Sequence, residues 1–134
     1  MMKPAMVIVA AAAVMLGAAT SAHADAFQSV SLGGHVRGQA AFFASVDGES
    51  FRICDRHRDN LPVVVRFSYI RKNGTRQTGS HWHKAGVDGL GNGGVRGCSS
   101  GHHNFGEGRR VWFQACVAHA GGNLTCREVE VTVA

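Results

Sequence analysis

Residues 109–133 decide the fold, and their sequence is RRVWFQACVAHAGGNLTCREVEVTV. Valines and aromatics alternate there with polar residues on both sides of a small-residue tip at 120–122, which is typical of a β-hairpin. A turn centred on Gly121 places Cys116 opposite Cys126, on the polar face of the hairpin. The same register predicts four further pairs: Phe113 with Val129, Val111 with Val131, Gln114 with Glu128 and Trp112 with Glu130.

The chain has four cysteines, and an even number in an exported protein predicts two disulfides. The hairpin register pairs Cys116 with Cys126, which leaves Cys54 for Cys98. In the chain-entropy account, the two loops are worth about 3 and about 4 kcal/mol respectively. For a small core these are large contributions.

The first residues have the pattern of a cleavable export signal. Lys3 precedes an apolar run over residues 5–19, and Ala22-His23-Ala24 supplies the small-x-small motif of a cleavage site. A transmembrane anchor needs about 20 unbroken apolar residues, and this run is shorter. The sequence therefore predicts a signal peptide at residues 1–24 and a secreted, extracellular protein without membrane contact after cleavage.

Cleavage after Ala24 leaves 110 residues, enough for one domain with a core. Without Lys3, 13 Lys and Arg stand against nine Asp and Glu, a net charge of +4. This surplus favours contact with polyanions such as cell-wall polymers or with an acidic partner. The basic residues are scattered and the chain has a single Tyr for stacking, so no nucleic-acid partner is expected.

Alternating polar and apolar residues predict strands over 35–45, 50–55, 62–69 and 75–84, before the final hairpin. Residues 85–101 contain seven glycines and are expected to form a long surface loop tied down at Cys98. With a short strand possible at 102–105, the count is six to seven strands and no helix. The predicted fold of residues 35–134 is an all-β antiparallel β-sandwich of immunoglobulin-like size, with a closed barrel as the alternative.

Residues 25–34 are expected to form an extended N-terminal arm. Their alternation would also suit a first strand, but the Gly33-Gly34 pair makes a hinge and the segment has few apolar residues to hold it down. As an arm, it would bind a partner through Phe27, Val30 and Leu32 by adding a strand to the partner's sheet.

Several motifs give the chain a resemblance to known proteins. They are GESFRICD at 48–55, Gly97-Cys98, F-x-E-G at 105–108 and the last two cysteines flanking Val117. In these it resembles a group of small secreted four-cysteine β-sandwich proteins of streptomycete-like bacteria, which implies a fold but no activity. Its layout is also similar to the adaptor subunit of umbrella toxin particles, which implies a role in linking a lectin subunit to a toxin chain.

Histidine is the conspicuous polar residue. His81 and His83 lie two apart on a predicted strand, so their rings would share one face about 7 Å apart, with His102 and His103 as further metal ligands. The favoured interpretation is that these are exposed residues of an edge strand, with Trp82 turned into the core. The sequence therefore predicts neither a metal site nor any other cofactor.

No catalytic residues are predicted. There is no G-x-S-x-G motif, and Ser99-Ser100 lie in the glycine-rich segment, which is expected to be too mobile to hold a hydroxyl against a base. Asp55, His57 and Asp59 fall in a turn whose default is a solvated surface. The acids form no pair on rigid supports of the kind that glycoside hydrolysis needs.

Binding is the remaining class. Trp112 lies on the polar face of the hairpin and is a candidate anchor for a partner. The sequence predicts a secreted non-catalytic adaptor that binds other secreted proteins and is not an enzyme. The alternative is an inhibitor of secreted hydrolases, a protease or an amylase, acting through a disulfide-tied loop near Cys98 or His57.

Overall fold

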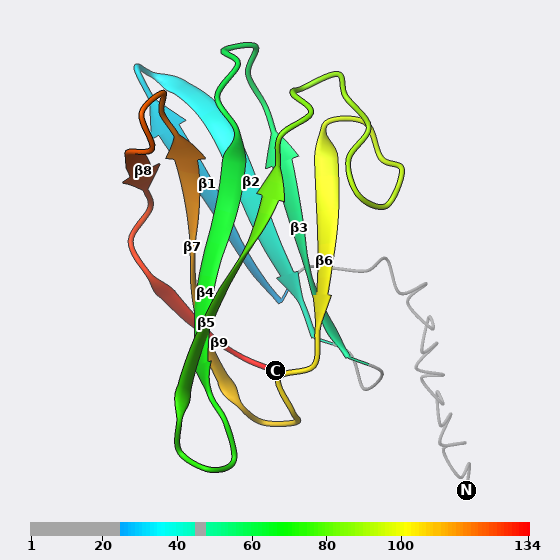
Figure 1. The fold of residues 1–134 in the computed structure, drawn as a ribbon, viewed down its shortest axis with the longest axis vertical. Helices are drawn as coiled ribbons and strands as arrows, with labels where there is room; N and C mark the ends of the chain where they lie inside the picture. The colour runs from blue at the N-terminus through cyan, green and yellow to red at the C-terminus, as the bar shows by residue number, and fades with distance from the viewer. Residues whose placement is uncertain (1–24, 45–47) are drawn as a thin grey trace, which may run out of the picture.

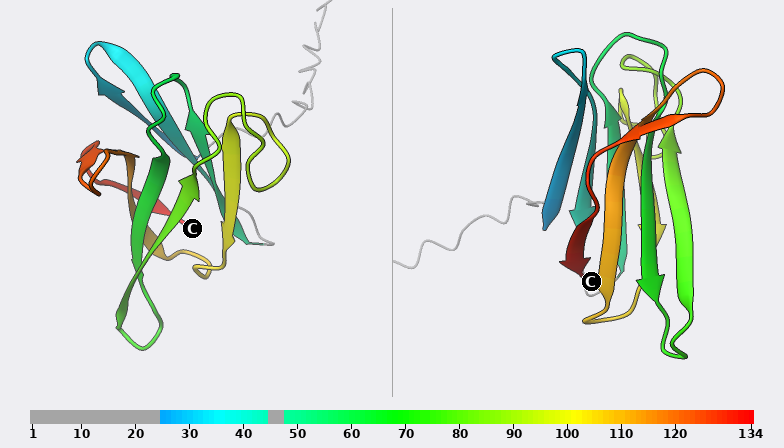
Figure 2. Two further views of the ribbon diagram at one scale, coloured as in Figure 1. Left: turned by 45° about the horizontal axis from the view of Figure 1, so that its top comes forward. Right: turned by 90° about the vertical axis from the view of Figure 1, so that its left-hand side faces the viewer.

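The computed structural model describes residues 25–44 and 48–134, so the predicted signal peptide at 1–24 lies outside the described residues. Two antiparallel sheets face each other as two layers (Figures 1 and 2). The first sheet has the order β1-β2-β3-β6, and the second has the order β5-β4-β7-β8, with β9 also pairing with β7. No helix in residues 25–44 and 48–134 is long and apolar enough to cross a membrane. The strands are β1 (Ala26–Leu32), β2 (His35–Phe43), β3 (Glu49–Asp55), β4 (Val63–Ile70), β5 (Arg76–His83), β6 (Cys98–His103), β7 (Arg110–Ala118), β8 (Leu124–Cys126) and β9 (Glu130–Val133).

The predicted all-β sandwich is confirmed, with more strands than expected. Residues 26–32 form a strand of the first sheet, and the predicted glycine-rich loop ends in β6. The return strand of the final hairpin is split into β8 and β9. The described residues therefore hold nine strands instead of six or seven.

The core lies between the sheets and is filled by alternate residues of each strand. As predicted, the odd-numbered side chains of β4 from Val63 to Tyr69 point inward, whereas Arg66 is exposed. The buried cluster consists of Val30, Ala40, Phe42, Phe51, Ile53, Val63, Val65, Phe67, Tyr69, Phe105, Val111, Phe113, Ala115 and Val117.

Both predicted disulfides are confirmed, and each joins neighbouring strands of one sheet. Cys54 pairs with Cys98 between β3 and β6, with their Cα atoms 4.1 Å apart. Cys116 pairs with Cys126 between β7 and β8, with their Cα atoms 4.0 Å apart. Two disulfides are compatible with an oxidising environment.

The predicted hairpin register holds at the disulfide and is wrong beyond it. Cys116 faces Cys126, but Phe113 pairs with Glu130 and not with Val129. Two residues of β7 therefore face three of the returning chain, which is a β-bulge. Because a shift of one residue exchanges the two faces, the pairs predicted for Val111 and Trp112 are also wrong: Val111 faces Thr132 and Trp112 faces Val131. Gln114 lies at the bulge, between the two paired segments.

The buried side chain of Gln28, on β1, stabilises this bulge. It accepts a hydrogen bond from the Ala115 backbone N–H at 2.8 Å and donates one to the Glu128 carbonyl at 2.7 Å. Arg127 donates its backbone N–H to the Ala115 carbonyl at 2.9 Å. The side chain of Gln28 thus satisfies backbone groups that a regular ladder would pair.

Residues 25–34 are therefore part of the sandwich and not a separate arm, which corrects the prediction. β1 pairs with β2 along its whole length, and Val30 is 3% exposed in the core. Together with Gln28, Val30 fixes this edge strand against the second sheet. Gly33 and Gly34 form the tight turn into β2 with positive φ.

A buried carboxylate links two of the motifs that carry the resemblance. Glu49 is buried at the start of β3, and its Oε2 accepts a hydrogen bond from the Phe105 backbone N–H at 3.0 Å. Phe105 packs against Tyr69 and His103 in the core, with ring centroids 4.9 and 4.4 Å away. These motif residues therefore have a structural role.

Candidate functional site

The outer face of the five-stranded sheet is the main candidate site, and we call it the tryptophan face. It gathers the side chains of β4, β5 and β7 that alternate with the core residues, together with the valines of the returning chain. Its members are Val64, Arg66, Ser68, Ile70, Arg76, Thr78, Ser80, Trp82, Trp112, Gln114, Leu124, Val129, Val131 and Val133.

Both indoles of this face lie beside a cation. The Arg76 guanidinium is 4.8 Å from the centroid of the Trp112 ring and also donates to Ser68 Oγ at 3.0 Å. Lys84 Nζ is 5.0 Å from the centroid of Trp82. Such cation–π contacts limit the freedom of the side chains before any ligand arrives.

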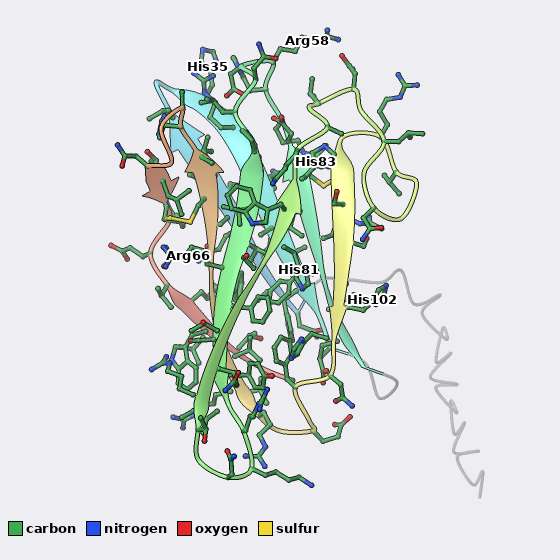
Figure 3. The ribbon with its side chains drawn as sticks, in the orientation of Figure 1. His35, Arg58, Arg66, His81, His83 and His102 are labelled. Atoms are coloured by element: carbon green, nitrogen blue, oxygen red, sulfur yellow. A yellow bond between two sulfur atoms is a disulfide. The ribbon has the colours of Figure 1, made fainter. Side chains whose placement is uncertain are left out.

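A shallow groove of about 480 Å³ runs across the tryptophan face between the two indoles. Arg66 projects from the middle of β4 into this region (Figure 3). Arg76 lines the groove from β5. Its remaining lining is apolar, hydroxyl or amide, and it includes no carboxylate. The groove therefore combines aromatic surface with positive charge.

The bulge adds an apolar strip beside the groove. Val129, Val131 and Val133 are 55%, 52% and 56% exposed, whereas Glu130 and Thr132 alternate with them in β9 and are less exposed. The predicted register placed Val129 and Val131 in the core. The extra residue in the returning chain turns them outward instead.

The predicted partner-binding residues lie on different parts of the molecule. Trp112 lies on the tryptophan face, as the alternation predicts, and is partly exposed. Phe27 is 52% exposed, but it lies on the outer side of the other sheet. Leu32 ends β1 and is partly exposed, and Val30 is buried and cannot contact a partner in the folded protein.

The two sides of β5 are the reverse of the prediction. His83 is fully buried and His81 points between the sheets, whereas Trp82 is 39% exposed on the tryptophan face. The His81 ring stacks on Phe67 with centroids 5.3 Å apart. It occupies the space over Gly101 of β6, where a Cβ atom would lie 2.2 Å from the ring. The two sheet edges therefore close over a histidine.

Burial lowers the pKa of two of these histidines below the ordinary value. For His81, the proximity of His103 and His102 lowers the pKa further. For His103, Glu49 opposes the lowering caused by burial, and Arg71 adds to it. His102 points outward and is exposed. In the described parts of the chain, no group of three or more His, Cys, Asp or Glu side chains is arranged to hold a metal ion.

His83 and Ser99 form a buried pair that the sequence analysis did not anticipate. Ser99 belongs to β6 and not to a mobile loop, and its Oγ is 2.8 Å from His83 Nδ1. His83 Nε2 lies 2.7 Å from the Gly86 carbonyl, which can only accept, so Nε2 carries a proton. In the neutral ring Ser99 therefore donates to Nδ1. Because both side chains are buried, this pair holds the loop of residues 84–97 against the sandwich.

The cluster of Asp55, His57 and Asp59 at the end of β3 also makes hydrogen bonds within the fold. Asp55 is buried, burial raises its pKa, and its Oδ1 accepts a hydrogen bond from the His57 backbone N–H at 3.1 Å. Arg37 donates to Asp59 at 3.0 Å and to His57 Nδ1 at 2.7 Å. The cluster is therefore a structural network and not the solvated surface that was expected.

The loop of residues 84–97 is ordered by backbone hydrogen bonds. Gly97 donates to the Gly89 carbonyl at 2.8 Å, and Ser100 donates to the Asn92 carbonyl at 2.8 Å. Leu90 pairs with Arg96 as an isolated bridge and is 66% exposed. The loop therefore presents a leucine on a supported turn, next to the Cys54–Cys98 disulfide.

No protein-family model, curated protein or solved structure matches this chain. The tryptophan face contains residues that sequence reasoning missed as a site, above all Trp82, Arg66 and Arg76. The alternation in β4 already placed Arg66 outside, opposite the core residues. Trp82 pairs with Val64, which points to the same side of β4 as Arg66. The same alternation, followed across this pair, could therefore have placed Trp82 on the outer face.

Proposed function

We infer that this chain is a secreted, non-catalytic protein-binding domain and that the tryptophan face is its interface. The supporting observation is the concentration of exposed large apolar side chains on one sheet. Five of them lie on this face, and the valines of β9 turn outward while its polar side chains turn inward. A water-facing sheet surface normally has the opposite pattern.

The chemistry of the face also favours protein recognition. Tryptophan and arginine dominate the energetics of protein interfaces, and here Arg76 already lies against Trp112. The face is built on hydrogen-bonded strands and is stapled by Cys116–Cys126. A partner would therefore bind a preorganised surface with little loss of side-chain freedom.

An adaptor role follows from the same layout, because an adaptor must contact two partners at once. Phe27 lies on the outer side of the opposite sheet, so a second protein could bind there while the tryptophan face is occupied. The resemblance to the adaptor subunit of umbrella toxin particles supports this narrower form through the predicted export signal and the disulfide-bonded β-domain, but not through an N-terminal arm, because residues 25–34 belong to the sandwich. The predicted export signal at residues 1–24 and the two disulfides support an extracellular setting.

Matched substitutions test this proposal. Val131 and Phe27 are both 52% exposed, one on each sheet. Val131→Asp should remove from tagged protein one partner that co-purifies from the producer's culture medium, as identified by mass spectrometry. Phe27→Asp should retain this partner and lose only a protein bound to the opposite sheet. The recovered partner is then purified and its binding to the two variants measured by calorimetry. A partner that binds Val131→Asp as tightly as the unaltered protein would contradict the proposal.

A second candidate function is inhibition of a secreted hydrolase, and the loop of residues 84–97 favours it. Leu90 is 66% exposed on a turn fixed by backbone hydrogen bonds and anchored at Cys98. A supported loop with one projecting apolar side chain suits insertion into an active site. Assays with subtilisin-like, trypsin-like and metalloproteases and with amylases test it. Inhibition that is lost in Leu90→Gly but kept in Val131→Asp would assign the activity to this loop.

A further inference from the structure

The tryptophan face has a charge pattern that restricts its partner. Arg66 and Arg76 lie at the groove, and the groove lining has no carboxylate. In the part of the chain that the structure describes, neither arginine forms an ion pair. Because both guanidiniums lie beside an apolar surface, a bound partner would remove them from part of their water. A matching negative charge on the partner would then be needed.

A second copy of this chain fits the face poorly. In a two-fold symmetric contact the same patch meets itself, so Arg66 and Arg76 of one copy would approach those of the other. The chain as a whole carries 14 Lys and Arg against nine Asp and Glu, which adds to the repulsion. Like charges brought together at an interface disfavour association.

A polysaccharide fits less well than a polypeptide. Sugars bind flat on open indole faces, but Trp112 has the Arg76 guanidinium over its ring and Trp82 has Lys84 over its ring. The strip formed by Val129, Val131 and Val133 offers no side-chain hydrogen-bonding groups for sugar hydroxyls. Apolar side chains of a protein would cover this strip instead.

We propose that the tryptophan face binds an acidic polypeptide segment. Carboxylates of this segment pair with Arg66 and Arg76, and its apolar side chains cover Val131 and the exposed edge of Trp112. The inference deepens the proposed function and rests on it, since it specifies the chemistry of the partner at the same face. It requires both kinds of contact, because the arginines and the valine strip border one groove.

A displayed peptide library tests the inference. The exported protein is immobilised through a tag before Asp25, because the chain ends next to β9 on the candidate face. Random twelve-residue peptides on phage are selected on it, and the enriched peptides are synthesised and their dissociation constants measured. We expect sequences that combine Asp or Glu with aromatic or aliphatic residues. Binding should weaken about tenfold in Arg66→Glu and should also weaken with added NaCl.

Arg52→Glu is the matched control for Arg66→Glu. Arg52 lies in the middle of β3 and is exposed on the outer side of the other sheet, so its reversal changes the net charge by the same amount. Binding should persist in Arg52→Glu. Equal losses in the two variants would indicate a general charge effect and would overturn the inference.

The outcomes separate the inference from the proposed function. Peptides that are neutral or basic and lose binding in Val131→Asp but not in Arg66→Glu would overturn the acidic partner and leave the protein-binding face intact. Enriched peptides that all bind Val131→Asp normally would overturn both. A glycan on an array that competes for the face, or a dimer that dissociates in Val131→Asp during sedimentation, would likewise overturn the inference.

Discussion

The outer faces of the two sheets differ in what they expose. Both have a disulfide between neighbouring strands, and both have an exposed arginine at mid-sheet, Arg52 on one and Arg66 on the other. On the four-stranded sheet the neighbours of the arginine are small, namely Ser50, Ser100 and Ala41, whereas the five-stranded sheet has tryptophans and valines beside Arg66. Two sheets of similar construction therefore present one mostly solvated surface and one surface suited to a partner.

The exposed valines of the five-stranded sheet result from the bulge in the last hairpin. Without the extra residue, Val129 and Val131 would point inward and the outer face would have acidic residues instead. Gln28 of the first sheet holds this bulge in place with two hydrogen bonds. A residue of one sheet thus decides what the other sheet exposes.

Removing the disulfides should give the largest loss of unfolding free energy, and removing each one separately compares the two sheets. The Cys54→Ser/Cys98→Ser double variant should lose about 4 kcal/mol of unfolding free energy, and Cys116→Ser/Cys126→Ser about 3 kcal/mol, because the first bridge closes the longer loop. Urea unfolding of both variants measures this. A reversed order would mean that the bridge beside the bulge contributes more than chain entropy.

Gln28→Leu should have the next largest effect. It leaves the Ala115 N–H and the Glu128 carbonyl without their buried partner, which should cost about 2–3 kcal/mol. The control is Gln39→Leu, because Gln39 bonds Ser29 and Arg56 at the protein surface. This variant should stay within about 0.5 kcal/mol of the unaltered protein in the same urea titration. Equal losses would remove the special role of Gln28.

A pair of valine substitutions tests which face each valine occupies. Val111→Thr should cost about 2 kcal/mol, because it places a hydroxyl in the core. Val131→Thr should change stability by less than about 0.5 kcal/mol, because Val131 is on the outside. In the regular register predicted from the sequence, the two valines pair on the inner face. Similar losses in the two variants would favour that register.

Acidification should give the smallest effect. His81 and His103 have lowered pKa values in the folded protein, so the unfolded chain binds their protons first as pH falls. Their contribution to stability is fully present above the ordinary pKa of about 6.5 and is lost as pH falls towards the lower folded values. The raised pKa of Asp55 acts in the opposite direction, because its contribution is present below the ordinary acidic value and is lost as pH rises.

The net expectation is that the urea concentration at the midpoint of unfolding decreases when the pH is lowered from 7.5 to 5.5. His81→Phe removes one titrating group and keeps a ring on Phe67, so its midpoint should depend less on pH in this window. His35→Gln is the control, because His35 is exposed and is not among the groups that lower the pKa of His81 or His103. A pH profile of His81→Phe that matches that of the unaltered protein would contradict the assignment.

Some of the candidate site followed from local pattern and some did not. The alternation in β4 and β7 placed Arg66 and Trp112 outside, since strongly apolar core residues flank Arg66 along β4 and Trp112 along β7. β5 gave no such signal, because Trp82 is its single large apolar residue and the others are polar or glycine. A lone tryptophan is readily assigned to the core, but here His81 and His83 fill the inner positions through contacts with Phe67 and Ser99.

The sequence by itself determined the all-β class and the centre of the last turn, because alternation and turn residues are local patterns. It also determined the disulfide pairs, because the hairpin register pairs Cys116 with Cys126 and only Cys54 and Cys98 remain. Only the tertiary structure decided the bulge, the place of β1 and the side of the sheet that exposes tryptophan. The bulge depends on Gln28, which is 87 residues from the backbone N–H of Ala115 that it bonds. No local pattern contains such a contact, and it forms only when the two sheets pack together.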